Sequence, residues 1–146
     1  MSTPTIRAAQ VTDAARIASL SDQLGYPVEP DQIHQRLEQL LGRPEHLILV
    51  AESSEEVVGW SHAAVEDILE TGRHCEILGF VVAAGQRGQG IGRRLIGEIE
   101  RWAVQRGLDQ VAVRSNVLRE ESHPFYKRMG YDHVKTQHVY RKGLRS

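Results

Sequence analysis

A glycine-rich segment between two apolar patterns is the part of this sequence best suited to chemistry. Residues 87–92 read Arg-Gly-Gln-Gly-Ile-Gly, between the apolar run 77–82 and a helical pattern that begins near Ile91 and ends near Arg106. The first turn of a helix leaves backbone N–H groups without partners, and glycine lets a phosphate approach them without hindrance from a Cβ. The segment therefore predicts a binding site for a pyrophosphate.

The sequence of this segment does not match the two common nucleotide-binding motifs. A Rossmann fingerprint needs Gly-x-Gly-x-x-Gly at the opening of a helix, and a P-loop needs Gly-Lys followed by Ser or Thr. Gly92 is instead followed by two arginines. The pattern that fits is Arg-x-x-Gly-x-Gly, formed by Arg87, Gly90 and Gly92. It resembles the pyrophosphate loop of the GNAT N-acetyltransferase superfamily, in which the pyrophosphate belongs to acetyl-CoA.

A second group of residues extends this resemblance over residues 74–144. In chain order the group is Ser115-Asn116, Arg119, His123, Phe125-Tyr126 and Gly130-Tyr131. The wide spacing between the asparagine and the Phe-Tyr pair resembles the branch that contains aminoalkylphosphonate acetyltransferases and some relatives of aminoglycoside 6′-acetyltransferases. Residues 1–73 match the family only in the order of their elements, so they imply nothing specific about the acceptor substrate.

The resemblance implies an acetyl-CoA-dependent N-acetyltransferase that moves an acetyl group to a primary amine of a small molecule by direct attack in a ternary complex. Two alternatives stay open. The acceptor could be a protein lysine or N-terminus, or the chain could be a non-catalytic CoA-binding sensor. The presence of both Glu76 and Tyr126 counts against a sensor.

The cofactor contacts that the resemblance implies lie at the end of a strand, in the glycine loop, at the start of the helix and in the later motif. The backbone N–H of Val82, or of a residue beside it, polarises the acetyl carbonyl group in this interpretation, because a splayed strand leaves it unpaired. The implied set is Phe80, Val81, Val82, Arg87, Gly88, Gln89, Gly90, Ile91, Gly92, Arg93, Asn116, Phe125 and Tyr126.

Two residues are predicted to carry the proton transfers. An alkyl ammonium with a pKa of about 10 must lose a proton before it attacks, and Glu76, six residues before Val82, is where several GNATs place a general base. Tyr126 corresponds to a phenol near the CoA sulfur, which can protonate the leaving thiolate. The alternatives are a solvated strand residue at Glu76, with ordered water as the base, and a tyrosine that only packs at Tyr126.

The acceptor site is the least specified part of the prediction. His74, Arg119 and His123 are expected to border its entrance. A polycationic aminoglycoside would favour an acidic cleft, for which the sequence offers Glu52, Glu55, Glu56, Glu66, Asp67 and Glu70. An aminoalkylphosphonate would favour a basic pocket, for which it offers Arg73, His74, Arg119 and His123.

Cysteine and metal chemistry are not expected. Successive strand residues point to opposite faces, so Cys75 cannot face the acetyl group if Glu76 does, unless a bulge occurs near Gly79. The seven histidines show no metal-ligand spacing.

The composition favours one soluble domain, residues 1–146. The net charge of −1, with 25% charged residues, disfavours nucleic acid as a partner. Neither a signal peptide nor a membrane-spanning stretch is found, which predicts a cytoplasmic protein with no membrane partner. The resemblance implies a homodimer, since dimers are common in the family.

The elements that must position these residues follow from apolar periodicity. Strands are expected at 5–8, 47–51, 57–65, 75–82, 110–114 and 133–140, and helices at 12–25, 30–42, 91–106 and 122–129. Together they predict an α/β fold with a mixed sheet and helices on both faces, and the resemblance implies a sheet of the GNAT type, mostly antiparallel and of six to seven strands. The resemblance adds a splayed parallel pair, near Val82 and Ser115, that forms the slot for CoA.

Overall fold

The computed structural model describes residues 3–23, 25, 27–86, 90–114 and 122–145, and for Ser122 and His123 the backbone alone. Contacts within the chain group its residues into two compact units, Met1–Arg114 and Ser115–Ser146. Each unit is described separately below.

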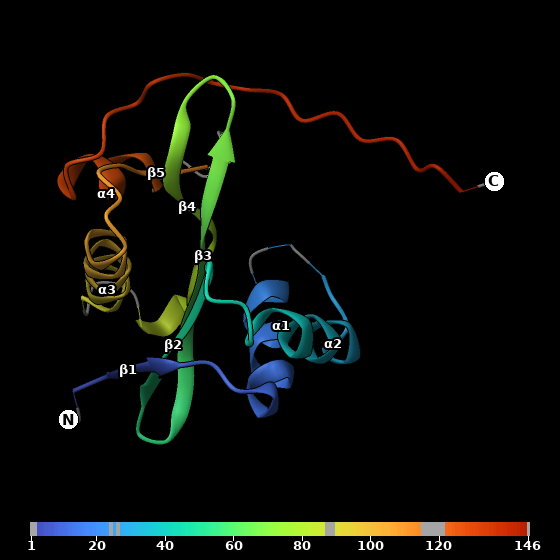
Figure 1. Ribbon diagram of the computed structural model, residues 1–146. Helices are drawn as coiled ribbons and strands as arrows, with labels where there is room; N and C mark the ends of the chain where they lie inside the picture. The colour runs from blue at the N-terminus through green and yellow to red at the C-terminus, as the bar shows by residue number, and fades with distance from the viewer. Residues whose placement is uncertain (1–2, 24, 26, 87–89, 115–121, 146) are drawn as a thin grey trace. The chain divides into compact units, whose positions relative to one another are not determined.

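The first unit is built on a five-stranded sheet, ordered β1-β2-β3-β4-β5 (Figure 1). Its strands are β1 (Thr5–Ala8), β2 (His46–Ser53), β3 (Glu56–Ile68), β4 (Gly72–Val82) and β5 (Val111–Val113). The first four pair antiparallel, and β5 pairs parallel to β4. The predicted first five strands and the parallel return strand are therefore confirmed.

Helices cover both faces of this sheet, as predicted. The short 3-10 turn η1 (Val11–Asp13), α1 (Ala14–Gln23) and α2 (Pro30–Leu40) lie on one face, and α3 (Ile91–Gln105) lies on the other (Figure 1). Pro30 opens α2, where a missing N–H costs nothing, and the chain turns at Leu41 and Gly42. None of the helices in the described ranges is long and apolar enough to cross a bilayer.

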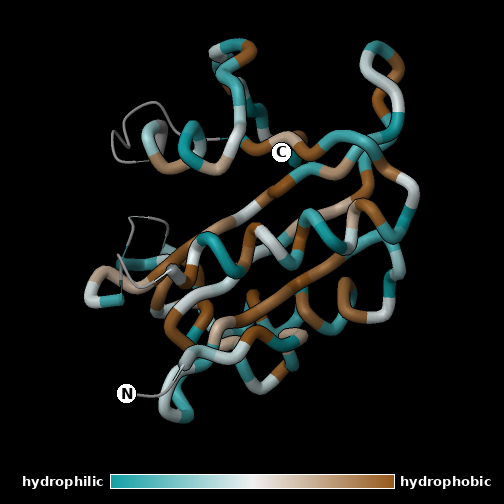
Figure 2. The backbone as a smooth tube through the Cα atoms, turned by 90° about the vertical axis from the view of Figure 1, so that its left-hand side faces the viewer, coloured by the Kyte–Doolittle hydropathy of each residue, from teal (hydrophilic) through white to brown (hydrophobic). Residues whose placement is uncertain are grey.

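Helix α3 packs through one apolar stripe across hydrophobic strand segments (Figure 2). Its buried side chains, spaced three to four residues apart, are Ile91, Leu95, Ile96, Ile99 and Ala103. A Cβ on Gly59 of β3 would lie 3.4 Å from Ile91 and 3.6 Å from Leu95. The glycine therefore lets the start of α3 approach β3 closely, next to the end of β4.

A bulge in β4 separates its two halves. Ala63 of β3 pairs with Ile77, but His62 pairs with Gly79, so Leu78 is an extra residue on β4. The ring of Trp60 covers Gly79, where a Cβ would lie only 2.6 Å from two of the ring carbons. The bulge foreseen as an exception near Gly79 is thus present, and it lies after Glu76.

The two faces of the sheet can be assigned from these contacts. Gly59 faces α3, so Ala63 and its partner Ile77 face α3 too, because paired residues share a face and alternate residues along a strand do as well. Ala64 and its partner Glu76 point to the face that carries α1 and α2.

The second unit contains α4 (Ser122–Arg128), as predicted within one residue. The strand predicted at His133–Tyr140 is wrong: these residues have no regular secondary structure, and the sheet has five strands rather than six to seven. Alternating apolar residues make a strand only when a neighbouring strand accepts their backbone hydrogen bonds. In the described part of the chain no ladder includes this segment, and Val134 and Tyr140 are 90% and 91% exposed.

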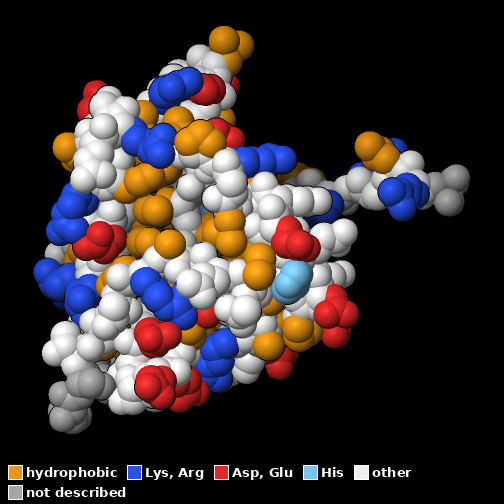
Figure 3. All heavy atoms as spheres, turned by 60° about the horizontal axis from the view of Figure 1, so that its bottom comes forward, with side chains coloured by type: hydrophobic (Ala, Val, Ile, Leu, Met, Phe, Trp, Pro, Cys, Tyr) orange, Lys and Arg blue, Asp and Glu red, His pale blue; other side chains and the backbone are white. Residues whose placement is uncertain are grey.

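The surface carries both charge signs. Figure 3 shows acidic and basic side chains interspersed on the face that it brings forward. This distribution agrees with the net charge of −1 and provides no single-sign field on that face.

Candidate active site

The end of β4 leaves a backbone N–H on an open strand edge. The Ala83 N–H donates to the Val58 carbonyl of β3 at 2.8 Å, so the alternation of a strand turns the Val82 N–H toward the opposite edge. On that edge β5 pairs with only three residues, Cys75 to Ile77. Beyond them, none of the described strands pairs with this edge of β4, so no described strand accepts a hydrogen bond from the Val82 N–H.

The beginning of α3 lies just beyond this strand end. A short 3-10 turn, η2 (Ala84–Gln86), follows β4, and Gly90 caps the helix in the left-handed region, with φ of 79°. Gly90 has no side chain with which to cap the helix, and the Arg94 N–H donates to the Gly90 carbonyl at 3.1 Å. The N–H groups of the first turn, at Ile91, Gly92 and Arg93, have no partner within the helix and are available to an anion.

The remaining part of the predicted pyrophosphate loop, Arg87, Gly88 and Gln89, lies outside the described residues. Within the described part, Arg93 is exposed, whereas the side chain of Ile91 is buried. Ile91 can therefore reach a ligand through its backbone N–H and not through its side chain. Phe80 and Val81 precede Val82 and alternate between the two faces of β4.

Glu76 is buried and has two side-chain partners. It is 7% exposed, and its Oε1 lies 3.1 Å from Nε2 of His74. Its Oε2 lies 2.8 Å from Nε of Arg114, with which it forms an ion pair. Sequence reasoning identified Glu76 but assigned it no partners, and it placed His74 at the acceptor entrance. The structure instead buries His74, which is 5% exposed, against Glu76.

The sequence analysis missed a contact between two histidines. Nδ1 of His46 lies 2.9 Å from Nε2 of His62, and the two rings are stacked with centroids 5.2 Å apart. Burial, and to a smaller extent the charge of His46, lowers the pKa of His62 to about 4. The alternation of β3 puts His62 on the same face as Ala64 and hence as Glu76.

The register of the β2–β3 hairpin brings His46 and His62 together. His46 lies opposite Ala64, and His62 is two residues from Ala64 on the same face, which makes the two histidines diagonal neighbours. That register depends on the position of the turn between β2 and β3. Among the side chains that the structure describes, no group of three or more His, Cys, Asp and Glu could hold a metal ion.

Cys75 lies on the face opposite to Glu76. It pairs with Val65 of β3 and Val111 of β5 and is fully buried. Burial, with a smaller contribution from the neighbouring Glu76 charge, raises the pKa of its thiol to about 11. A neutral, buried thiol is a poor nucleophile.

The acidic residues proposed for an aminoglycoside cleft do not gather in one place. They fall at the two ends of β3, a strand of 13 residues that spans about 40 Å. Three of them are paired with arginines, Glu52 with Arg7 at 3.0 Å, Glu56 with Arg16 at 2.8 Å and Asp67 with Arg73 at 2.8 Å.

The basic set is divided as well. Arg73 and His74 are consecutive on β4, so their side chains point to opposite faces. Arg119 lies outside the described residues, as does the side chain of His123.

The second unit contains Tyr126 and Phe125. Their rings pack edge to face with centroids 5.4 Å apart, and the Tyr131 ring lies 6.3 Å from that of Tyr126. The Tyr131 N–H donates to the Tyr126 carbonyl at 3.0 Å, which closes the end of α4. Both Phe125 and Tyr126 are half-buried. Asn116 lies outside the described residues.

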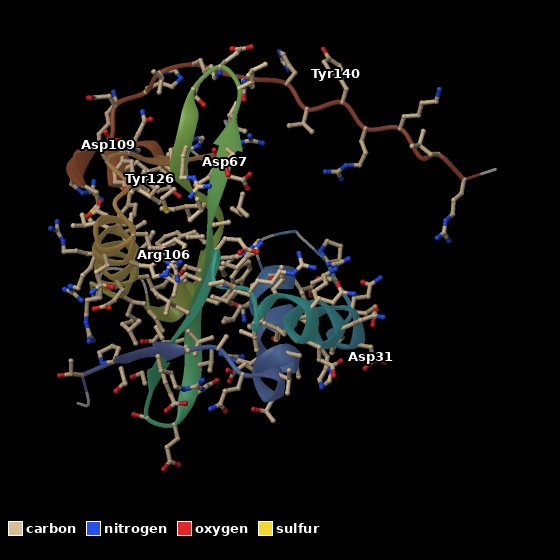
Figure 4. All side chains as sticks on the ribbon, in the orientation of Figure 1. Asp31, Asp67, Arg106, Asp109, Tyr126 and Tyr140 are labelled. Carbon is tan, nitrogen blue, oxygen red and sulfur yellow. The ribbon has the colours of Figure 1, made fainter. Side chains whose placement is uncertain are left out.

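One cavity of about 760 Å³ lies elsewhere in the first unit. Its walls come from the end of β3, the start of β4 and the last turn of α3, and they include Asp67 and Arg106 (Figure 4). Arg106 covers the ring of Trp102 at 4.8 Å. This cavity is at the C-terminal end of α3, whereas the predicted pyrophosphate site is at its N-terminal end.

Several known proteins that resemble this chain are acetyltransferases. The model of the acetyltransferase (GNAT) family matches residues 13–131. An aminoglycoside N(6′)-acetyltransferase type 1 of Stenotrophomonas maltophilia is 27% identical over 148 residues, covering 98% of this chain and 95% of the relative. A protein of the same name from Klebsiella aerogenes is 25% identical, covering 98% of this chain and 99% of its own length.

A solved structure of the aminoglycoside 6′-N-acetyltransferase AAC(6′)-Ih from Acinetobacter baumannii has a TM-score of 0.82 at 20% identity, covering 97% of this chain and 99% of its own. The complex of AAC(6′)-Iy with CoA has a TM-score of 0.85 at 19% identity, covering 97% and 96%. The chain therefore belongs to the acetyltransferase (GNAT) family and is an N-acetyltransferase.

Proposed function

We propose that this protein transfers the acetyl group of acetyl-CoA to a primary amine of a small molecule, by direct attack in a ternary complex. The observation that carries the proposal is the edge of β4 beyond Ile77, where no described strand pairs with the Val82 N–H, close in sequence to the N-terminus of α3. The Val82 N–H can bind the acetyl carbonyl oxygen, and the N–H groups at the start of α3 can bind phosphate.

The described residues fit acetyl-CoA on both counts. The first-turn N–H groups of α3 suit the pyrophosphate, and Arg87, Gly88, Gln89 and Arg93 extend that site in our proposal. The Val82 N–H suits the carbonyl oxygen, and we assign Asn116 to the pantetheine arm. Acetyl-CoA supplies an acetyl group activated as a thioester. The Val82 N–H adds a fixed hydrogen-bond donor for the negative charge that develops on the carbonyl oxygen of the acetyl group.

Glu76 and Tyr126 carry the proton transfers in this proposal. Glu76 takes a proton from the acceptor ammonium, directly or through water, so that the nitrogen lone pair can attack the carbonyl carbon. Tyr126 gives its phenolic proton to the sulfur as the carbon–sulfur bond breaks. Its ordinary pKa of about 10 exceeds that of a thiol, so it stays protonated until then.

The acceptor is proposed at the level of a small primary amine. The relatives named aminoglycoside acetyltransferases make aminoglycosides the first class to test. We place the acceptor near the face that carries α1 and α2, because Glu76 points there. Arg119 and His123 are proposed to border its entrance.

We further propose a single catalytic domain in a cytoplasmic homodimer, with no nucleic-acid or membrane partner. The family match, residues 13–131, crosses the boundary between the two units, which supports one domain. The chain's net charge of −1 also disfavours binding to nucleic acid.

The test is acetyl-CoA-dependent thiol release with aminoglycosides, aminoalkylphosphonates, polyamines, arylalkylamines and short peptides. We expect release with one class of small amine. Glu76→Gln is expected to lower kcat by at least about 100-fold, the usual contribution of a general base, and to leave acetyl-CoA affinity nearly unchanged. The matched control is Glu70→Gln, the same change at an exposed residue of the β3–β4 hairpin.

Three results would count against the proposal. Release with peptides alone would indicate a protein acceptor. Silence across the panel, with acetyl-CoA still raising Tm, would indicate a CoA sensor. Unchanged turnover in Glu76→Gln would remove Glu76 from the mechanism.

A further inference from the structure

We infer that His74 and Arg114 are positioning residues that hold the Glu76 carboxylate at the point where β4 and β5 part. The inference rests on the proposed function, in which Glu76 accepts the proton of the acceptor amine. Neither residue touches the reacting atoms in this proposal, and both act through Glu76.

The geometry of the three side chains follows from the sheet. Ala112 of β5 lies beside Glu76 of β4, and Arg114, two residues further, points to the same face. From there the Arg114 Nε lies 2.8 Å from Oε2 and forms an ion pair with the carboxylate. Nε2 of His74, two residues before Glu76 on β4, lies 3.1 Å from Oε1. Each carboxylate oxygen therefore has its own partner.

Because the Glu76 and His74 side chains are buried, the Glu76 carboxylate needs its contacts with His74 and Arg114 to compensate for lost water. The side chains of Glu76 and His74 are 9% and 7% exposed, and a buried carboxylate without partners is strongly unfavourable. Ala64 faces Glu76 from β3 and offers no polar group. The orientation of the carboxylate is thus set by His74 and Arg114.

The location of Arg114 connects this cluster to the open edge of β4. The last β4–β5 pair is Ile77 with Val113, one residue beyond the Glu76–Ala112 pair. The Arg114 side chain is 69% exposed although it binds a buried carboxylate, so Oε2 lies at the border of the buried cluster. When the carboxylate receives a proton, the charge of Arg114 is still stabilised by water, whereas a fully buried cation would lose its only partner.

The experiment is a double-mutant cycle read in kcat and in acetyl-CoA KM. The variants are His74→Leu, which removes the donor, His74→Gln, which restores an amide donor, and Arg114→Gln, each alone and combined with Glu76→Gln. We expect His74→Leu to lower kcat by about 10- to 100-fold through loss of orientation, with acetyl-CoA KM within about twofold. His74→Gln should recover part of the loss. In the Glu76→Gln background, both His74→Leu and Arg114→Gln should change kcat little.

Arg101→Gln is the matched control, because Arg101 is an exposed arginine paired with Glu98 on α3. It should leave kcat unchanged. Arg114→Gln provides the second test should His74→Leu fail to fold, since Arg114 is mostly exposed. The inference is overturned if the substitutions lower kcat equally with and without Glu76, or if they leave kcat unaltered in the wild-type background.

Failure of the proposed function gives a different result. In that case the wild-type protein turns over no acceptor, and the same cycle is read in the free energy of unfolding. Coupling between His74 and Glu76 then shows only that the contact stabilises the fold, and the positioning role is overturned together with the proposed function.

Discussion

At the scale of single residues, His62 is the group whose charge the fold constrains most clearly. Its pKa is about 4 in the folded protein and 6.5 ordinarily. Above pH 6.5 the ring is neutral in both states, so it does not affect stability. Between pH 6.5 and 4 the unfolded chain binds a proton that the folded chain does not bind, so the free energy of unfolding falls as the pH falls.

We expect this loss to be about 1–2 kcal/mol, because the ring is only partly shielded from water. Urea denaturation between pH 7.5 and 4 measures it, and His62→Gln should remove that part of the pH dependence. His34→Gln is the control, since His34 is an exposed histidine paired with Glu38. Parallel pH curves for the wild-type protein and His62→Gln would show that the ring is not held neutral.

Site residues could be predicted from the sequence where their motif lies within one segment of the chain. The roles of Glu76 and Val82 are implied by the resemblance to the GNAT family at this spacing along one strand, and they stay predictions. Arg114 and the His46–His62 pair depend on which residues face one another across strands. That register depends on the length of a turn and the position of a bulge, and neither changes the apolar pattern of the strands.

At the scale of elements, the bulge in β4 lies beside a close contact between Trp60 and Gly79. A Cβ at Gly79 would lie 2.6 Å from the ring, so Gly79→Ala must displace either the indole or the strand. We expect a loss of about 1–3 kcal/mol in the free energy of unfolding, as for other overpacked sites. Gly85→Ala is the matched control, because no atom lies within 4 Å of its Cβ position. An equal effect of both substitutions would mean that the Trp60 contact carries no strain.

The elements themselves were largely predictable, because their signals are periodic. The stripe of α3, with Leu95 and Ile99, marks a helix that buries one face, and the apolar runs of β2 to β4 mark strands that are buried on both faces within the first unit. The segment 133–140 was also predicted to be a strand and forms none in this structure. A strand needs a partner edge, and the pattern of one segment does not specify that edge.

At the scale of the whole molecule, the segment 132–145 motivates the proposed homodimer. Its large apolar side chains, Val134, Val139, Tyr140 and Leu144, are 75–91% exposed. Backbone groups outside regular structure, together with exposed apolar side chains, favour pairing with the sheet edge of another chain.

We expect light scattering to give twice the 16.4 kDa mass of one chain. Val134→Lys combined with Val139→Lys should shift the protein toward monomer. Val104→Lys, at a valine 72% exposed on α3, should not. A wild-type monomer at all concentrations would refute the homodimer, and a dimer unaffected by either set of changes would place its interface outside this segment.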